Sequence, residues 1–278
     1  MNVATLNCNN NVTESVVTPP QMKNILLWYD ASQHKDISSG NIAELYDRSG
    51  NGHGVKQTTT ASQPANAVLS GKFAGRRVAY FDSFEDRFGS GDDSFVDGTV
   101  DLEDCFGEIS SLNDDPPWTI AYVDSITHAS TTSSIFLLET TGISATEIRV
   151  KEKGTGLNDG IQLKIVSDTA VSDTDECGGD FIVANTPRIN VISSVHSSGS
   201  TGLAVSSNGS ALGWDGGGDR TVNFATFASV NKLTLGVKDG TTDEGLTHLA
   251  EFIFFNAALE DEELAQLTSY LNDKWQVY

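Results

Sequence analysis

The clearest pattern of hydrophobic and polar positions lies near the end of the chain, in LTHLAEFIFFNAALEDEELAQLTSYLNDKW (246–275). Its apolar run from Leu249 to Phe255 is too short to cross a membrane and is rich in Phe and Ile, which predicts a strand buried on both faces. The period then changes to steps of three and four, as in an amphipathic helix, at Leu264, Leu267, Leu271 and Trp275.

The charges around this stripe agree with a helix. Four acidic residues, Glu260 to Glu263, precede or open its first turn, where the helix dipole favours anions. Lys274 lies in the last turn, where the dipole favours a cation. The sequence therefore predicts one short amphipathic helix directly after a buried strand.

The rest of the chain consists of short apolar or alternating runs separated by turn residues, which is typical of an antiparallel β-sandwich. Asn208-Gly209, inside the run from Leu203 to Trp214, favours a type I′ hairpin. No linker or repeat divides the chain, so we expect one sandwich of about a dozen strands. Further strands are predicted at Ile25–Tyr29, Ile42–Tyr46, Arg76–Phe81, Trp118–Asp124, Ser134–Glu139, Glu147–Lys151, Ile161–Val166, Ile189–Ser193 and Leu233–Val237.

Two stretches between these runs are predicted to be loops. Asp47 to Gly54 has glycines at alternate positions, which allow a tight irregular loop, but it lacks the Lys-Ser/Thr ending of a phosphate-binding loop. Gly89 to Pro117 is a long Asp- and Gly-rich excursion, with one helical turn expected near Leu102–Phe106.

Composition narrows the class of partner. With Lys+Arg 17 against Asp+Glu 38, the net charge is −21, which disfavours nucleic acid and anionic membranes. Residues 1–21 are polar and end in Pro19-Pro20, so we expect an extended arm, either a free terminus or a docking segment, followed by one sandwich over 22–278. The N-terminus has neither the basic segment nor the apolar core of a secretory signal.

The cysteines and histidines form no motif. Cys8, Cys105 and Cys177 share no short spacing; a disulfide between Cys105 and Cys177 is one alternative, and free thiols in a reducing cytosol are the favoured one. The five histidines are scattered, and each is expected on the surface or in a loop rather than in a catalytic role: His34, His53, His128, His196 and His248.

Four blocks in order resemble a known family: LWYDAS (27–32), DRSGNGHGVKQ (47–57), VAYFDSFEDRF (78–88) and AEFIFFNAALEDEELAQLTSYLNDKW (250–275). Together they resemble the concanavalin A-like, laminin-G-type jelly-roll domains found in bacteriophage structural proteins and bacterial surface proteins. The resemblance covers about residues 24–278. It implies an all-β antiparallel jelly-roll sandwich whose first and last strands are adjacent, and it implies little about chemistry, because relatives bind sugars, bind proteins or only build a particle.

Catalytic chemistry is not indicated. A glucanase relative would carry two carboxylates on one strand, facing the same way across a sugar cleft. The nearest acidic cluster, Asp101 to Ile109, has the spacing of a short helix instead. No Gly-x-Ser-x-Gly elbow is present. We therefore predict that the protein is not an enzyme.

An acidic stretch makes calcium the one cofactor worth considering. Asp82 and Asp86 flank the end of a predicted strand, and Asp92, Asp93 and Asp97 follow in a loop, where several carboxylate oxygens together would suit a hard cation. The run does not match the EF-hand pattern, and solvated loop acids are common, so no bound cofactor is the competing interpretation.

Sugar binding needs an exposed aromatic ring beside polar groups. Trp214, Asp215 and Asp219, in WDGGGD, offer a tryptophan at a strand end followed by a flexible acidic loop. The competing interpretation is that Trp214 lies in the core or at its rim and that the glycines form only a turn.

These observations lead to a functional hypothesis with two alternatives. The first is a non-catalytic virion protein (a decoration, fibre or tail-appendage subunit) whose arm at 1–21 docks on other virion proteins and whose sandwich faces glycan or host surface. The alternatives are a secreted or surface bacterial adhesin or carbohydrate-binding module, and a glucanase-like hydrolase. The expected location is the virion, or else the cell surface or the extracellular medium. The ligand, the position on a particle and any homo-oligomer are not encoded in a recognisable pattern.

Overall fold

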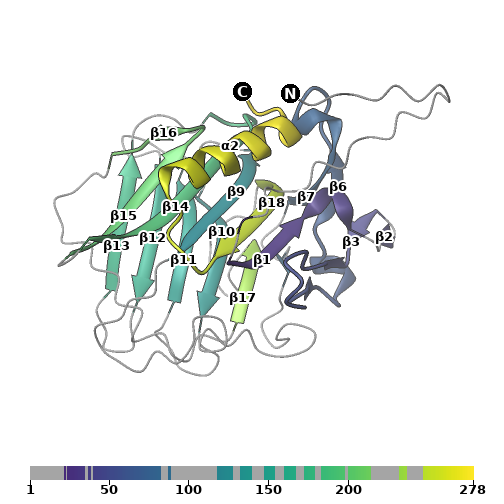
Figure 1. Ribbon diagram of the computed structural model, residues 1–278. Coiled ribbons are helices and arrows are strands. Elements are labelled where there is room, and N and C mark those ends of the chain that lie inside the picture. The colour runs from purple at the N-terminus through teal and green to yellow at the C-terminus, as the bar shows by residue number, and fades with distance from the viewer. Residues whose placement is uncertain are drawn as a thin grey trace.

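The computed structural model describes residue 22 and residues 24–34, 37–38, 40–82, 87–88, 118–127, 132–139, 147–153, 160–166, 172–178, 183–197, 200–213, 232–236 and 247–278. Within these residues the chain forms two large antiparallel sheets, one small two-stranded sheet and one C-terminal helix (Figure 1). The predicted all-β sandwich with a short C-terminal helix is therefore confirmed.

The larger sheet has ten strands in the order β16-β15-β14-β9-β18-β7-β6-β3-β2, with β1 also paired to β18. Its strands are β1 (Ile25–Asp30), β2 (Ile37–Ser38), β3 (Asn41–Ile42), β6 (Ala65–Val68), β7 (Arg77–Phe81), β9 (Thr119–Ile126), β14 (Arg188–Ser197), β15 (Ser200–Ser207), β16 (Ser210–Ala211) and β18 (Thr247–Phe255).

The second sheet has six strands in the order β13-β12-β11-β10-β17-β8. They are β8 (Arg87–Phe88), β10 (Thr132–Glu139), β11 (Glu147–Lys153), β12 (Gly160–Val166), β13 (Ser172–Gly178) and β17 (Lys232–Gly236). The small sheet pairs β4 (Glu44–Leu45) with β5 (Val55–Lys56), and the described helices are η1 (Ala31–Gln33), η2 (Thr60–Ser62), η3 (Phe73–Gly75) and α2 (Asp261–Trp275).

The main core lies between the two large sheets. Phe136 of β10 packs edge-on against Phe252 of β18, with ring centroids 5.3 Å apart, and Tyr29 of β1 stacks on the same Phe252. Burying such rings supplies most of the driving force that holds the sheets face to face.

Strand β18 is the central strand of the larger sheet, and all nine of its residues are buried. One edge pairs with β9; the other pairs with β7 at Thr247–Leu249 and then with β1 from Glu251 onward. The prediction of a strand buried on both faces is confirmed, and so is the adjacency of the first and last predicted strands.

A β-bulge in β18 decides which face Glu251 occupies. The register with β9 shifts between Leu249, which pairs with Asp124, and Glu251, which pairs with Val123. Because the extra residue, Ala250, breaks the alternation, Leu249 faces the inter-sheet core while Glu251 faces the opposite side.

Helix α2 covers this opposite face, lying across the larger sheet (Figure 1). The predicted stripe packs as expected: Leu267, Leu271 and Trp275 are buried, and Leu264 is half-buried. Trp275 meets Phe73 of η3 edge-on, with centroids 6.2 Å apart. A second apolar core thus lies between helix and sheet.

Glu251 is the polar centre of this second core. Its carboxylate is 1% exposed and accepts hydrogen bonds from four side chains. The donors are Trp28 Nε1 at 2.7 Å, Tyr270 Oη at 3.0 Å, Lys274 Nζ at 2.8 Å and Trp275 Nε1. Burial nevertheless raises the pKa of Glu251, against the opposing effect of Lys274.

Lys274 has a different role from the one that its position in the last turn suggested. Instead of lying in solvent near the helix dipole, its ammonium is buried and donates to Asp30 at 2.7 Å as well as to Glu251. Asp30 and Glu251 are directly opposite each other in the β1–β18 ladder, so the lysine pairs with two adjacent buried carboxylates, and Arg48 provides a second cation to Asp30 at 3.2 Å.

The other sequence predictions mostly hold. Each predicted strand falls on an observed one, although Ile42–Tyr46 is divided between β3 and β4, and Asn208 and Gly209, with φ of 50° and 75°, turn β15 into β16 as expected. Strands β2, β5, β6, β8 and β13 were not predicted.

The arm at 1–21 and the excursion at 89–117 lie outside the described residues, so the domain division stays a prediction. Across the described residues, no helix combines the length and apolarity that a membrane span needs.

Replacing Lys274 with methionine tests the buried network. Lys274→Met keeps the aliphatic stem but leaves Asp30 and Glu251 as adjacent buried carboxylates without their shared cation. We expect the free energy of unfolding to fall by about 3–5 kcal/mol, measured by urea denaturation. Asp273→Asn, at the exposed neighbouring position on the same helix, is the matched control and should change it by less than about 0.5 kcal/mol. A loss below about 1 kcal/mol for Lys274→Met would contradict this role.

Candidate functional site

Most of the candidate site residues suggested by the sequence lie outside the described residues: Trp214, Asp215 and Asp219 for a ligand, and Asp86, Asp92 and Asp93 for a metal. Asp82 is described and directly follows β7. No group of three or more His, Cys, Asp or Glu that could hold a metal ion occurs among the described residues. The calcium hypothesis therefore stays a prediction, as does the state of Cys105 and Cys177.

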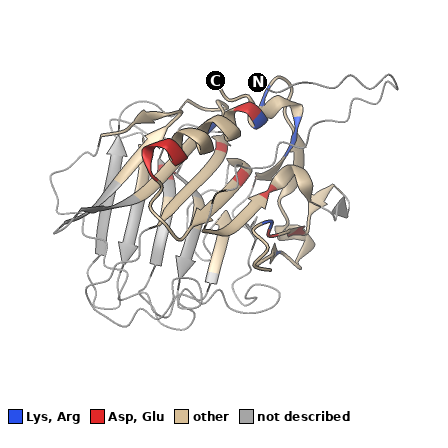
Figure 2. Ribbon diagram, viewed as in Figure 1, with Lys and Arg blue, Asp and Glu red and all other residues tan. Residues whose placement is uncertain are grey.

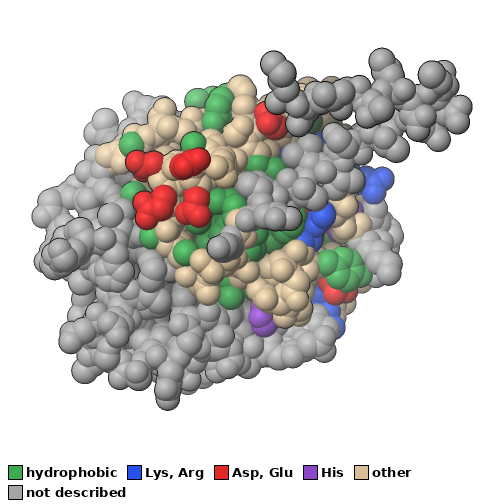
Figure 3. Space-filling view, in the orientation of Figure 1, with side chains coloured by type: hydrophobic (Ala, Val, Ile, Leu, Met, Phe, Trp, Pro, Cys, Tyr) green, Lys and Arg blue, Asp and Glu red, His purple; other side chains and the backbone are tan. Residues whose placement is uncertain are grey.

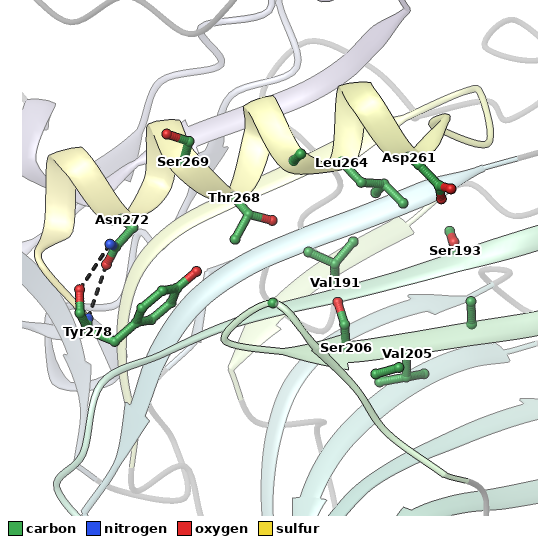
Figure 4. Close-up of a pocket in the computed structure, with 14 residues that line it drawn as sticks. Val191, Ser193, Val205, Ser206, Asp261, Leu264, Thr268, Ser269, Asn272 and Tyr278 are labelled. Atoms are coloured by element: carbon green, nitrogen blue, oxygen red, sulfur yellow. Dashed lines mark hydrogen bonds between the residues drawn. The ribbon is translucent and has the colours of Figure 1, made fainter.

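An open groove of about 650 Å³ lies between helix α2 and strands β14, β15 and β16 (Figure 4). The helix forms one wall, the strands form the floor, and the C-terminal Tyr278 and the Asn208-Gly209 hairpin close one end. None of these residues was singled out as a ligand site from the sequence.

The floor exists because outward-facing positions on the strands carry small side chains. Ser193 on β14 pairs with Ala204 on β15, and Ser206 on β15 pairs with both Val191 and Ala211. Larger residues at these positions would fill the space beneath the helix. Alternation along the strands places all five on the face that α2 partly covers.

The wall is a stripe of α2 that lies beside the apolar stripe anchoring the helix, with Leu264 at the boundary between them. Asp261, Ala265, Thr268 and Asn272 recur at steps of four, three and four, which places them in line along the helix. From the first to the last the helix rises about 16 Å, a length that accommodates an oligosaccharide segment. Figure 4 shows Thr268 and Leu264 projecting from α2 over the strands.

The closed end is fixed by Asn272. Its Oδ1 accepts hydrogen bonds from the backbone N–H groups of Val277 at 3.1 Å and of Tyr278 at 3.0 Å, and its Nδ2 donates to the main-chain oxygen of Tyr278 at 2.9 Å (Figure 4). Gln276 adopts a left-handed conformation, with φ of 50°, which turns the chain back after the helix. The aromatic ring of Tyr278 is thereby held at the groove while remaining 61% exposed.

The groove thus combines an exposed aromatic ring with neutral hydrogen-bonding groups. Hydroxyls line it at Ser193, Ser206, Thr268 and Ser269, and among the described residues of the lining the one acidic side chain is Asp261. The aromatic-plus-polar combination that the sequence suggested for Trp214 is therefore found in the described part of the chain at Tyr278. A terminal tyrosine after a helix gives no sequence signal of this kind.

A second polar cluster is sealed between the two sheets. Arg188 of β14 binds both Asp124 of β9, at 3.1 Å, and Glu152 of β11. Asn190 also donates to both carboxylates, at 2.9 and 3.1 Å, and Tyr122 donates to Glu152. Because Glu152 comes from the opposite sheet, the cluster links the two layers of the sandwich.

This carboxylate pair does not form a sugar-cleaving site of the kind sought in the sequence. Asp124 and Glu152 are each 0% exposed, so no cleft reaches them. Burial, together with the charge of Glu152, raises the pKa of Asp124 well above its usual range. Strand alternation could have indicated them: Asp124 follows Ile120 and Tyr122, and Glu152 follows Val150, on inward-facing positions.

The expectation that every histidine lies on the surface or in a loop is wrong for His248. This residue lies in β18, is 6% exposed and stacks on Tyr80 of β7, with ring centroids 4.3 Å apart. Burial, aided by the charge of Lys72 and opposed by a hydrogen bond to the Ser125 backbone, lowers the pKa of His248 to about 4. A buried, neutral histidine of this kind packs as an aromatic residue.

Comparisons with known proteins identify the fold but no family. Scans of protein-family models and of curated proteins find no match. Among solved structures, the botulinum neurotoxin serotype D ligand binding domain, in complex with N-acetylneuraminic acid, is similar with a TM-score of 0.52 and 10% identity, over 89% of this chain and 50% of that chain. This chain has a lectin-like β-sandwich fold.

A second structure agrees. The receptor binding domain of the botulinum neurotoxin C/D mosaic serotype is similar with a TM-score of 0.52 and 11% identity, over 89% of this chain and 51% of that chain. The chain therefore spans about half the length of these two structures. At such identities the likeness shows a shared fold, and membership of the concanavalin A-like family stays a prediction.

The buried histidine gives a testable pH dependence. The folded pKa of His248, about 4, lies below the unfolded value of about 6.5, so the unfolded chain binds more protons between these values. Acidification from pH 7 to pH 4 should therefore lose up to about 3 kcal/mol of stability through this residue. His248→Gln should show a shallower fall than wild type in urea titrations across this range. His53→Gln, in the 47–54 loop, controls for the loss of a histidine; equal slopes in wild type and His248→Gln would contradict the assignment.

Proposed function

We propose that the protein is a non-catalytic carbohydrate-binding β-sandwich that holds a glycan in the groove between α2 and β14–β16. The observation that carries the proposal is the combination of an open groove of about 650 Å³, four lining hydroxyls and the exposed ring of Tyr278. A sugar offers an apolar face to an aromatic ring and hydroxyls to polar groups, so it matches both parts of this lining.

The size and shape of the groove suit this ligand class. Its volume lies within the range of about 300–1,000 Å³ typical of small-ligand sites. It is elongated along the helix and open to solvent, as a site for part of a longer chain has to be. The buried Glu251 network holds helix α2 in place, and the hydrogen bonds of Asn272 hold Tyr278 at the end of the groove. The site is therefore formed before any ligand binds.

The comparisons support the proposal at the level of fold. The neurotoxin domain that this chain resembles was solved with N-acetylneuraminic acid bound, which makes sugar binding a natural function for a sandwich of this type. The buried Asp124–Glu152 pair gives no support to a hydrolase. That the protein is not an enzyme nevertheless stays a prediction.

The location of the protein is also part of the proposal. We place the sandwich on a virion, with the arm at 1–21 docking on other virion proteins, and keep the adhesin or surface module as the alternative. The net charge of −21 favours either solvent-facing role over contact with nucleic acid.

Removing the aromatic ring should weaken glycan binding. Tyr278→Ala keeps the backbone bonds to Asn272 but removes the ring on which a sugar would stack. We expect an affinity loss of at least about tenfold for glycans identified on an array, measured by titration calorimetry, with Tyr278→Phe retaining most of it. Tyr46→Ala, at another exposed tyrosine, is the control. Unchanged binding by Tyr278→Ala would exclude this groove as the site.

Filling the groove should block it without affecting the fold. Ala265 is an exposed helix residue that lines the groove, and Gln266 is its exposed neighbour outside the lining. We expect Ala265→Trp to abolish glycan binding and Gln266→Trp to leave it intact, with similar melting temperatures for both. If the two variants bind glycans equally well, the ligand does not occupy this groove.

A further inference from the structure

The charges around the groove bear on which glycans it accepts, an inference that rests on the proposed function. No Lys, Arg or His is present among the described residues that line it. The one acidic side chain in this described part of the lining, Asp261, lies at the end opposite Tyr278 (Figure 4). An anionic sugar would therefore find no cation to pair with in this lining.

Acidic side chains also surround that end of the groove. Asp261 is followed by Glu262 and Glu263 in the first turn of α2 and preceded by Glu260 at the N-cap. Figure 2 shows this turn as an acidic segment of the helix, and Figure 3 shows acidic side chains gathered on the surface there. Four carboxylates within one turn create a negative field that extends over roughly a Debye length, about 8–10 Å at ordinary salt.

The helix N-terminus does not offset this field for a ligand. Free backbone N–H groups at such a terminus commonly attract anions. Here the backbone N–H of Glu260 donates to the Glu263 carboxylate at 3.0 Å, and the side chain of Glu260 caps the N–H of Glu263 in return. The positive end of the helix dipole is thus already neutralised by the chain's own carboxylates.

The polar groups of the groove lining suit an uncharged sugar. The hydroxyls of Ser193, Ser206 and Thr268 can both donate to and accept from sugar hydroxyls. Asp261 can accept hydrogen bonds from sugar hydroxyls, and charge-assisted bonds of this kind are strong. Asn272 contributes little directly, because its amide is occupied by the Val277–Tyr278 backbone.

We propose that the groove binds neutral glycans and rejects carboxylated and sulfated ones, with Asp261 as the specificity-determining residue. The ligand class therefore differs from the N-acetylneuraminic acid bound by the neurotoxin domain of similar fold. The discrimination is electrostatic, so it should weaken as salt rises. It also has a direct component, because Asp261 lines the groove while Glu262 does not.

The test uses an array of glycan pairs that differ only in a terminal N-acetylneuraminic acid, such as lactose and sialyllactose. For wild type we expect the neutral member of a bound pair to bind at least about tenfold tighter, with the ratio falling when salt is raised from about 50 mM to about 500 mM. Asp261→Asn should reduce the ratio severalfold, by improving binding of the anionic member and weakening that of the neutral one. Glu262→Gln removes one charge from the same turn without touching the lining and should change the ratio by less than about twofold.

The possible failures are distinguishable. If wild type binds the sialylated member as tightly or more tightly, and Tyr278→Ala abolishes that binding, the selectivity is wrong and the proposed function stands. If Glu262→Gln changes the ratio as much as Asp261→Asn does, Asp261 is not the specificity residue. If no glycan binds, or binding is unaffected by both Tyr278→Ala and Ala265→Trp, the groove is not a glycan site and both proposals fall.

Discussion

The structure depends on one buried carboxylate. Glu251 lies in the central strand of the larger sheet and is bound by Trp28 from β1 and by Tyr270, Lys274 and Trp275 from α2. A carboxylate in such a place is tolerated only when its oxygens are satisfied, so the strand, its partner and the helix have to be present together. The network fixes the angle and height of α2 over the sheet.

The groove follows from that placement. Because α2 is anchored over β18 by its apolar stripe, the neighbouring stripe of the helix overhangs β14–β16, whose small outward residues leave space beneath it. The same helix therefore carries two sets of residues with separate tasks. Leu267, Leu271 and Trp275 hold the fold, while Asp261 and Thr268 face the groove.

The sequence predicted the fold class because the relevant signals are local. The run around Phe252 and the stripe through Leu267 encode a buried strand and a helix by period alone, and Asn208-Gly209 encodes its own turn. Strand β13 was missed because SDTDECG is polar and carries no apolar alternation. Glu251 was visible inside an apolar run, yet its partner Lys274 is 23 residues away, and no period links the two.

The groove could not be predicted for a related reason. Its floor and wall come from residues roughly 190–210 and 261–278, which are brought together only by tertiary packing. Small residues such as Ala204 and Ser206 form no sequence pattern that marks a groove, since they contribute to it only by being too small to fill it. The aromatic residue that the sequence offered as a candidate sugar platform, Trp214, lies just outside the described residues.

The position of β18 has a consequence for how the chain reaches this state. β18 follows every other described strand in the sequence, yet it lies between β9 on one side and β7 and β1 on the other. During synthesis, the edges of these three strands have no partner until residues 247–255 emerge, and exposed strand edges favour pairing with other chains. Strand β18 therefore joins the centre of the sheet after its neighbours have been made. Until then, the nascent chain exposes the apolar strand edges that β18 later covers.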